Sequence, residues 1–483
     1  MTRTNGRSAH CAWALAAALA LAASLVVAFL TLSSASADPP TATRGSSGLR
    51  YALIPTSGAP SASVSAALAV NIGPTPHGPT YSPVADECAT CHRTHTGKSK
   101  NLLKAASPQS TLCFTCHDGS GALANVQVQY TAAGGPENVP ANREYYRHEA
   151  TVASSHTSSL AEVEFKGTLN RHSECSDCHN PHKADSTNSA ATPTPPTTTP
   201  STGWTASGRL SGVSGVSVNL AVAVTAPTYY KFLDGKTDLV THEYQLCFKC
   251  HSGFTALPGN AGFTPSKHLL DKGVEFDPRN PSFHPIEAMG TNQTAAMAAS
   301  LAGGNVWKFL TTDTIRCSNC HASPAKLTPT PAKGADLPPH TSPNRGILLQ
   351  KYEDRALRTT PFDTNDFALC FMCHASSPFS SEAGDNTRTN FRYHGKHTAA
   401  LGDGNGAAID TPGAGQGNAI CAECHFRLHG ATKDMGGNQT IPGSRLVNFS
   451  PNITGSGGVR SWSQTGRSCT LTCHGENHTG WNY

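Results

Sequence analysis

The sequence predicts a mostly irregular, loop-rich fold with short helices and little continuous sheet. The 483 residues include 44 glycines and 33 prolines, and only 14% are charged, a composition unlike that of a large helical or sheet-built core. One short stretch of cysteines and a histidine recurs eight times, with irregular segments between the copies. Once a leader segment is set aside, each copy has about 56 residues, fewer than a domain usually needs to build a core alone.

The repeated stretch is C-x-x-C-H in seven copies and C-x-x-x-C-H in the eighth, a spacing that signals covalent attachment of a c-type haem. Two thiols one helical turn apart reach the vinyl groups on one porphyrin edge, and the next residue brings its imidazole under the iron. The attachment cysteines are Cys88, Cys91, Cys113, Cys116, Cys175, Cys178, Cys247, Cys250, Cys317, Cys320, Cys370, Cys373, Cys421, Cys424, Cys469 and Cys473. The proximal iron ligands are predicted to be His92, His117, His179, His251, His321, His374, His425 and His474.

Zinc half-sites, redox dithiols and disulfides also use closely spaced cysteines. None of them requires a histidine directly after the second cysteine in every copy. The motifs use all the cysteines except Cys11, which lies in the leader. We therefore predict eight c-type haems, with an eighth turn distorted by its extra residue.

The haems are expected to provide the core, because porphyrin faces supply the apolar surface that aliphatic side chains would otherwise give. The predicted fold is accordingly a set of loops and short α-helices wrapped around a stack of eight haems. Haem propionates offset the formal net charge of +4, so this charge says little about partners. We expect no nucleic-acid partner.

Residues 1–37 have the pattern of a secretory signal peptide: a basic head, an apolar run over about 12–32 and the small-residue site Ala35-Ser36-Ala37. The apolar run is long for a signal peptide, so an uncleaved membrane anchor is the alternative. Either way the haem-bearing part is expected outside the cytoplasmic membrane, as a secreted, periplasmic or extracellular protein. Contact with the membrane is expected only through this segment.

The remaining chain divides into an extended N-terminal arm over 38–76 and four two-haem modules over 77–150, 151–255, 256–380 and 381–483. The modules follow from a repeated order of motif types along the chain. The second module contains a low-complexity insert over 187–202, rich in Thr, Pro and Ser. After the insert, alternating valines from Val216 to Val224 predict a small β insertion near 210–230, to which we assign no chemistry.

The second axial ligand decides what each iron can do, since a second histidine makes an electron relay and an open position binds substrate. Fourteen histidines remain after the proximal ones and His10. A histidine three or four residues after a motif histidine shares its face of the turn, so it can only serve another haem. The first choices for distal ligands are His77, His95, His156, His182, His284, His340, His397 and His429, and the second choices are His148, His268, His394 and His478. His172 and His242 rank lowest because each closely precedes a motif cysteine.

The unit C-x-x-C-H-x-x-H, Leu102-Leu103, Leu112-Cys-Phe-Thr-Cys-His117 recurs over most of the chain. It resembles the doubled-C-x-x-C-H class of multihaem c-type cytochromes. The resemblance implies an electron carrier with mostly bis-histidine haems, whose partners are redox proteins or extracellular electron acceptors or donors. Some loop-rich members polymerise into extracellular filaments, in which a histidine of one subunit ligates a haem of the next. His77 on the arm would suit such a junction.

Two functions remain open. An electron carrier without catalysis requires eight six-coordinate haems, and the surplus of histidines favours it. An octahaem oxidoreductase acting on a nitrogen or sulfur oxyanion requires one haem with an open position. Because all eight motifs end in histidine, we predict a carrier with no catalytic residues.

Overall fold

The computed structural model describes a set of segments that all lie in one compact unit, Ala62–Tyr483. They are residues 77, 88–99, 101–122, 124–130, 146–151, 173–184, 206, 208–220, 229–254, 271–324, 337–352, 363–380, 384–398, 419–431, 443–450, 453, 460–473 and 476–482. Several predicted features lie outside the described residues: the signal segment 1–37, the arm 38–76, the insert 187–202, and His156, His172, His268 and His474.

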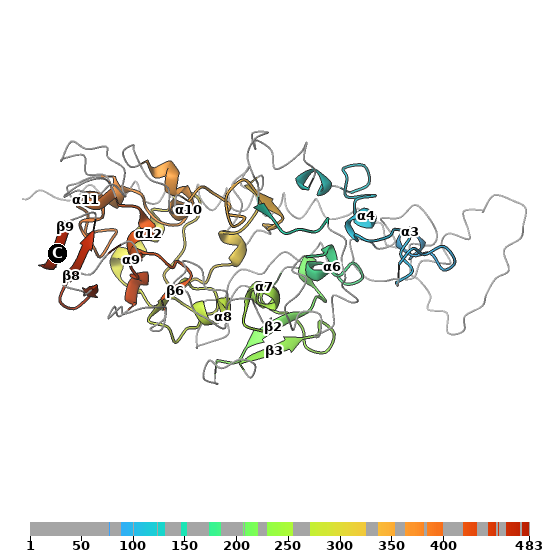
Figure 1. Cartoon of the computed structure of the whole chain (residues 1–483), viewed down its shortest axis with the longest axis horizontal. Coiled ribbons are helices and arrows are strands. Elements are labelled where there is room, and N and C mark those ends of the chain that lie inside the picture. The colour runs from blue at the N-terminus through green and yellow to red at the C-terminus, as the bar shows by residue number, and fades with distance from the viewer. Residues whose placement is uncertain are drawn as a thin grey trace, which may run out of the picture. The chain divides into compact units, whose positions relative to one another are not determined.

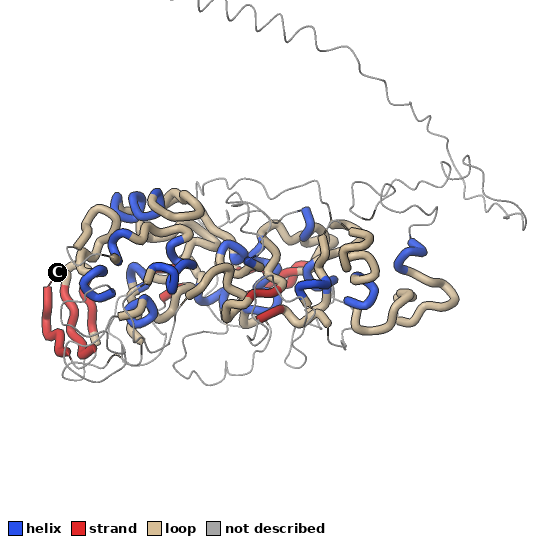
Figure 2. Tube along the Cα trace, turned by 90° about the horizontal axis from the view of Figure 1, so that it is seen from above, coloured by secondary structure: helices blue, strands red, loops and turns tan. Residues whose placement is uncertain are grey.

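Loops make up most of the described chain, and the helices between them are short (Figure 2). The α-helices are α3 (Cys88–Cys91), α4 (Ser110–Cys113), α6 (Cys175–Cys178), α7 (Glu243–His251), α8 (Lys272–Glu275), α9 (Ala295–Ala302), α10 (Ala368–Phe371), α11 (His394–Thr398) and α12 (Cys421–Cys424). The 3₁₀ turns are η1 (Gln127–Gln129), η2 (Gly208–Leu210), η3 (Cys317–Asn319), η5 (Thr364–Phe367), η6 (Ser377–Phe379) and η7 (Ser444–Leu446). The predicted loop-rich character is confirmed.

Within the described residues, no helix has the length and apolarity needed to cross a bilayer.

The strands form small antiparallel sheets, of which the β1–β5 and β4–β6 pairs join segments far apart in the sequence. They are β1 (Tyr146–Arg147), β2 (Gly215–Val218), β3 (Tyr230–Leu233), β4 (Ser282–Phe283), β5 (Thr341–Ser342), β6 (Gly430–Ala431), β7 (Ser461–Ser463), β8 (Ser468–Cys473) and β9 (Glu476–Asn482). The pairs are β1 with β5, β2 with β3 and β4 with β6, and β7-β8-β9 form a three-stranded sheet.

The predicted β insertion appears as the β2–β3 hairpin, which lies beside α7 (Figure 1). Val216 of β2 is fully buried, but burial does not alternate along the strand, because Gly215 is also buried and Ser217 and Val218 are both half-buried. The strand ends at Val218, and residues 221–228 lie outside the described part.

Small apolar clusters lie beside the motifs. Trp307, Phe309 and Met372 belong to one cluster, with Cys373 packed against it. A second, around Phe449 and Trp462, has cysteines of the seventh and eighth motifs at its edge. Motif cysteines also flank the other two clusters. The apolar core is therefore dispersed along the repeated motifs.

Candidate functional site

Each of the first seven motifs folds as a helical turn. In six of them the backbone N–H of the motif histidine donates to the carbonyl of the first cysteine, at 2.8–3.0 Å. The fourth motif lies inside α7, which begins after His242, where Gln245 Oε1 accepts the His242 N–H at 3.1 Å. One turn separates the two thiols in each case, as the spacing predicts. None of the sixteen motif cysteines forms a disulfide bond.

The eighth motif differs because Cys469 and Cys473 both lie on strand β8. Thr470 and Thr472 are β-branched and alternate with Leu471, a pattern that favours a strand over a helical turn. Four residues of strand span roughly 13 Å, against about 5–6 Å for one helical turn. The predicted distorted turn is therefore not seen, and these thiols do not have the spacing of the other seven pairs.

Histidine rings lie in pairs at a recurring distance, with interplanar angles from 14° to 84°. Six pairs join a motif histidine to a second histidine, with ring centroids 6.0–6.5 Å apart. They are His92 with His182, His117 with His77, His179 with His340, His251 with His148, His321 with His429, and His425 with His394. His374 of the sixth motif lies beside His284, since burial first and then His284 lower its pKa, to about 4.

This distance fits a metal ion between the two rings. A metal–imidazole bond is about 2.0 Å long and the ring centroid lies about 1.1 Å behind the nitrogen, so two imidazoles on opposite sides of one iron have centroids roughly 6.3 Å apart. Each such pair also lies next to two thiols one turn apart. The first seven motifs therefore fit covalently attached haem with two histidine ligands.

The Nδ1 atoms of these histidines are turned away from the gap. The Nδ1 atom of His92 lies 2.9 Å from the carbonyl of Asn101, and that of His321 lies 2.7 Å from the carbonyl of Gly346. The other histidines whose Nδ1 contacts a backbone carbonyl are His77, His148, His179, His284, His397 and His425. A carbonyl only accepts, so Nδ1 carries the proton and Nε2 is left as the ligand atom.

Four further histidines use a side chain as the Nδ1 partner. Gln129 Oε1 lies 3.1 Å from His340, and Glu275 Oε2 lies 2.8 Å from His429. Hydroxyl groups of Ser300 and Thr389 serve His374 and His394. Twelve histidines in total thus have their ring orientation set by a hydrogen bond at Nδ1.

The electrostatics favour neutral imidazoles, which is the form that binds metal. Burial, and after it the neighbouring histidines, lower the pKa of His321 and His374 to about 4 and that of His394 to about 3. At neutral pH these rings carry no proton on Nε2 and need no deprotonation to ligate iron.

Second histidines of consecutive motifs are held to each other. His148 follows β1, and His340 precedes β5. The His148 N–H donates to the carbonyl of His340 at 3.1 Å, and its Nδ1 donates to the carbonyl of Pro339.

The same arrangement recurs at β4 and β6. The His284 N–H donates to the carbonyl of His429 at 2.9 Å, and its Nδ1 contacts the carbonyl of Leu428. His77 repeats the second contact, with Nδ1 3.3 Å from the carbonyl of Pro181, which precedes His182. One structural device therefore sets the ligands of the first three motif pairs.

The thiols of successive motifs are neighbours. Burial raises the pKa of the Cys178 thiol to about 12, and Cys250 and Cys247 contribute to the increase. Thiol hydrogen bonds join Cys113 to Cys175, Cys247 to Cys317 and Cys370 to Cys421. The remaining neighbours are Cys91 with Cys116, Cys320 with Cys370, and Cys424 with Cys473. The spatial order of the motifs therefore follows the sequence from the first to the eighth.

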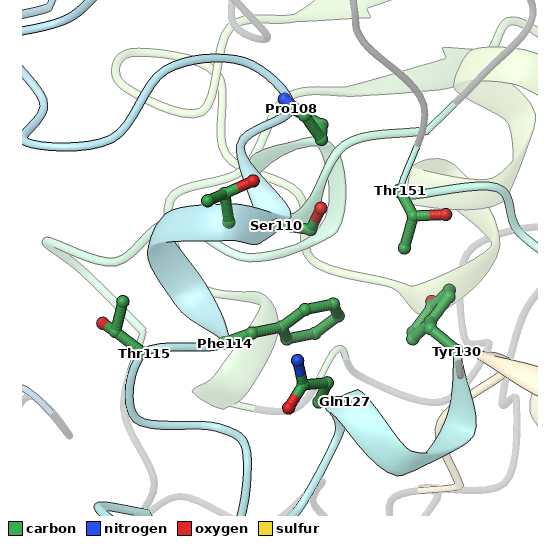
Figure 3. Close-up of a pocket in the computed structure, with 8 residues that line it drawn as sticks. Pro108, Ser110, Phe114, Thr115, Gln127, Tyr130 and Thr151 are labelled. Carbon is green, nitrogen blue, oxygen red and sulfur yellow. The ribbon is translucent and has the colours of Figure 1, made fainter. Parts of the chain in front are cut away.

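A cavity of about 410 Å³ opens beside the second motif, whose Phe114 and Thr115 line it together with Gln127 and Tyr130 (Figure 3). Burial raises the pKa of Tyr130, and the nearby thiols Cys175 and Cys178 raise it further. The Tyr130 ring lies 6.2 Å from that of His340. The cavity therefore borders the space between a cysteine pair and its second histidine, where a porphyrin needs room.

The remaining candidate histidines of the described segments lie outside the pairs with a motif histidine given above. His95 is exposed on the turn after the first motif, and no histidine ring pairs with it in the described segments. His397 lies 6.3 Å from His478, so this pair contains no motif histidine. His478 is opposite Leu471 in the β8–β9 register, and Trp481 packs on it at 4.6 Å. His242 lies at the start of α7, with Nδ1 bonded to Thr241.

Gln129 and Glu275, the side chains that hold ligand histidines, were not predicted from the sequence. Neither belongs to a motif, and each lies in a turn or helix of only three or four residues. No local pattern marks such positions.

Comparison with known families gives one match: residues 82–122 match the family model described as the doubled CXXCH motif. This range contains the first two motifs. No curated protein and no solved structure matches the chain.

Proposed function

We propose that this chain, a multihaem c-type cytochrome by its doubled CXXCH motif, carries electrons along eight bis-histidine haems outside the cytoplasmic membrane. The observation that carries the proposal is the series of paired histidines at one metal-spanning distance. The haem would supply one-electron chemistry at the iron. The chain's own residues bind it through thioethers, fix its axial ligands and exclude water.

We number the haems 1 to 8 by motif. The proposed ligand pairs are His92 and His182 for haem 1, His117 and His77 for haem 2, His179 and His340 for haem 3, His251 and His148 for haem 4, His321 and His429 for haem 5, His374 and His284 for haem 6, and His425 and His394 for haem 7. Haem 8 belongs to Cys469 and Cys473, with His397 as one ligand.

The succession of thiols supports a continuous path. A thioether sulfur is bonded to the porphyrin edge, so thiols in contact bring neighbouring porphyrin edges together. Such contacts join haems 2 and 3, 4 and 5, and 6 and 7. Electrons would therefore pass along the haems in the order of the motifs.

Spectroscopy of the purified ferric protein tests the carrier function. Eight low-spin electron paramagnetic resonance signals, unchanged by nitrite or cyanide, are expected, together with eight haems per chain by pyridine haemochrome and intact mass. A high-spin component near one haem in eight that binds nitrite would instead support an octahaem oxidoreductase. Seven haems per chain would show that the eighth motif is not loaded. Cell fractionation, with haem protein expected outside the cytoplasmic membrane, tests the secretion.

Self-association into a filament is supported by the module-to-module ligand pattern. His182, His340 and His429 each lie in one proposed module and face a motif histidine of the preceding module. His95 has the same position after the first motif as His182 has after the third, and residues 1–87 contain no haem motif for it to face. His77 faces His117 of its own chain, so His95 rather than His77 would extend the series.

In a head-to-tail contact, His95 of one copy would face His425 of the next and displace His394. Such a contact does not close on itself, so it would give a filament. Electron microscopy should show filaments for the parent protein and none for His95→Ala. Filaments that persist in His95→Ala with unchanged subunit spacing would refute this junction. The eight low-spin haems of the single chain do not depend on it.

A further inference from the structure

We propose that Glu275 lowers the reduction potential of haem 5 by accepting the Nδ1 hydrogen bond of its axial ligand His429. The inference rests on the proposed function, because it takes His429 as the ligand opposite His321. It assigns a role to a residue that lies outside every haem motif.

The contact is short, and its carboxylate is shielded from water. Glu275 is the last residue of α8 and only 1% exposed, and its Oε2 lies 2.8 Å from Nδ1 of His429. The Phe276 ring packs on the His429 ring at 5.1 Å. A hydrogen bond to a buried carboxylate is stronger than the same bond in water. Glu275 therefore acts on His429 with little screening.

A carboxylate is exceptional among the partners of the ligand histidines. Of the twelve Nδ1 contacts, eight go to backbone carbonyls, two to hydroxyl groups and one to the amide of Gln129. All of these partners are neutral. Glu275 is the one anion in this set.

The direction of the effect follows from charge. A carboxylate draws the Nδ1 proton towards itself, which makes Nε2 a stronger electron donor to the iron. The ferric ion carries one more positive charge than the ferrous ion and gains more from this donation. The buried negative charge acts in the same direction. Haem 5 is therefore harder to reduce than it would be with a neutral partner.

Lys272 opposes this effect. Its ammonium lies 2.6 Å from the same Oε2 atom of Glu275, and its side chain is 16% exposed. It withdraws charge from the carboxylate and weakens the pull on His429. Removing the carboxylate and removing the ammonium should therefore shift the potential in opposite directions, which a purely structural role would not produce.

The position of haem 5 gives the effect a consequence for transfer. Four haems precede it and three follow it along the proposed path. An electron that crosses the chain must pass haem 5. The reduction potential of haem 5 therefore sets the free-energy change of electron transfer from haem 4 and to haem 6. Glu275 and Lys272 together adjust that potential.

The test is an electron paramagnetic resonance-monitored redox titration of the full haem-loaded protein and five variants. Glu275→Gln keeps an acceptor for Nδ1 but removes the charge, and the reduction equilibrium of one haem should shift at least about tenfold towards the ferrous form, about 59 mV for one electron. Lys272→Gln should shift the same component towards the ferric form. Gln129→Glu gives His340 the carboxylate that His429 has, and should lower the potential of haem 3. Asp238→Asn removes a charge from the exposed Lys231–Asp238 pair and should shift nothing.

Opposite shifts in Glu275→Gln and Lys272→Gln, confined to one of the eight components, support the proposal. Unchanged potentials in Glu275→Gln with all haems low-spin would overturn it. A high-spin haem in Glu275→Gln would also overturn it, because Glu275 would then only hold His429 in place. His429→Ala separates the two proposals: if it leaves every haem low-spin, the ligand assignment itself fails.

Discussion

Alanine at Gly430 is expected to break the link between the second ligands of haems 5 and 6. Gly430 begins β6, directly after His429, and its backbone passes close to the end of α8. A Cβ atom there would lie only 1.8 Å from the carbonyl oxygen of Glu275 and 2.9 Å from the carbonyl carbon. Ordinary contact needs about 3.5 Å, so β6 and α8 must separate by roughly 1.5 Å.

That separation affects two hydrogen bonds made by His429, namely the one from the His284 N–H and the one to Glu275. Overpacking costs about 1–3 kcal/mol and loss of a charged hydrogen bond about 1.5–3 kcal/mol, so the local free energy of unfolding should fall by about 2.5–6 kcal/mol. One or two haems of the eight should then lose a ligand and become high-spin.

The assay is electron paramagnetic resonance of the ferric Gly430→Ala protein, combined with guanidinium titration of the Soret band. Gly290→Ala is the matched control, because a Cβ at Gly290 meets its nearest atom, Pro285 Cβ, only at 3.8 Å. The control should keep all haems low-spin. A Gly430→Ala protein with eight low-spin haems and unchanged resistance to guanidinium would refute the reasoning.

Three further predictions concern other parts of the chain. At the eighth motif we expect His478 to be the iron ligand opposite His397. His478→Ala should therefore give one high-spin haem that binds cyanide, and His474→Ala should give none. The reverse result would make His474 the ligand. Burial raises the pKa of Asp277, but Arg279 and the other donors outweigh it and hold the value below its usual range. A carboxyl with a depressed folded pKa stabilises the fold above its unfolded pKa of about 3.9, and this contribution is lost as the pH falls through the folded value. Tyr229, directly before β3, donates its hydroxyl to Asp277 Oδ2 at 2.9 Å, so acidification below about pH 4 should lower the protection factors of the β2–β3 amides against hydrogen exchange. Asp277→Asn should show at pH 7 the lowered protection factors that the parent shows only in acid. Haem-free chain should be unfolded, because the dispersed clusters lack a common core, and a cooperative melt by circular dichroism would contradict this.

The motif turns were predictable because they depend on local contacts. The hydrogen bond from His92 to Cys88 spans four residues, and the spacing of the motif already implies it. The strand at the eighth motif also has a local signal, the alternating Thr470 and Thr472, but the similarity to the other motifs outweighed it.

The pairing of ligands was not predictable in the same way. His148 was ranked below His95, yet the structure brings His148 to His251, while His95 is exposed. The outcome depends on β1 pairing with β5, almost two hundred residues later. Sequence distance from a motif carries no information about such a contact.

By itself, the sequence determined the number and kind of the motifs, the turn that seven of them form and the loop-rich character between them. All of these follow from short-range spacing and composition. Only the tertiary structure decided which histidine faces which motif, that successive thiols are neighbours, and that Glu275 reaches His429. These contacts join residues as much as about 200 positions apart through strands of two residues and helices of four, which are too short to leave a periodic pattern in the sequence.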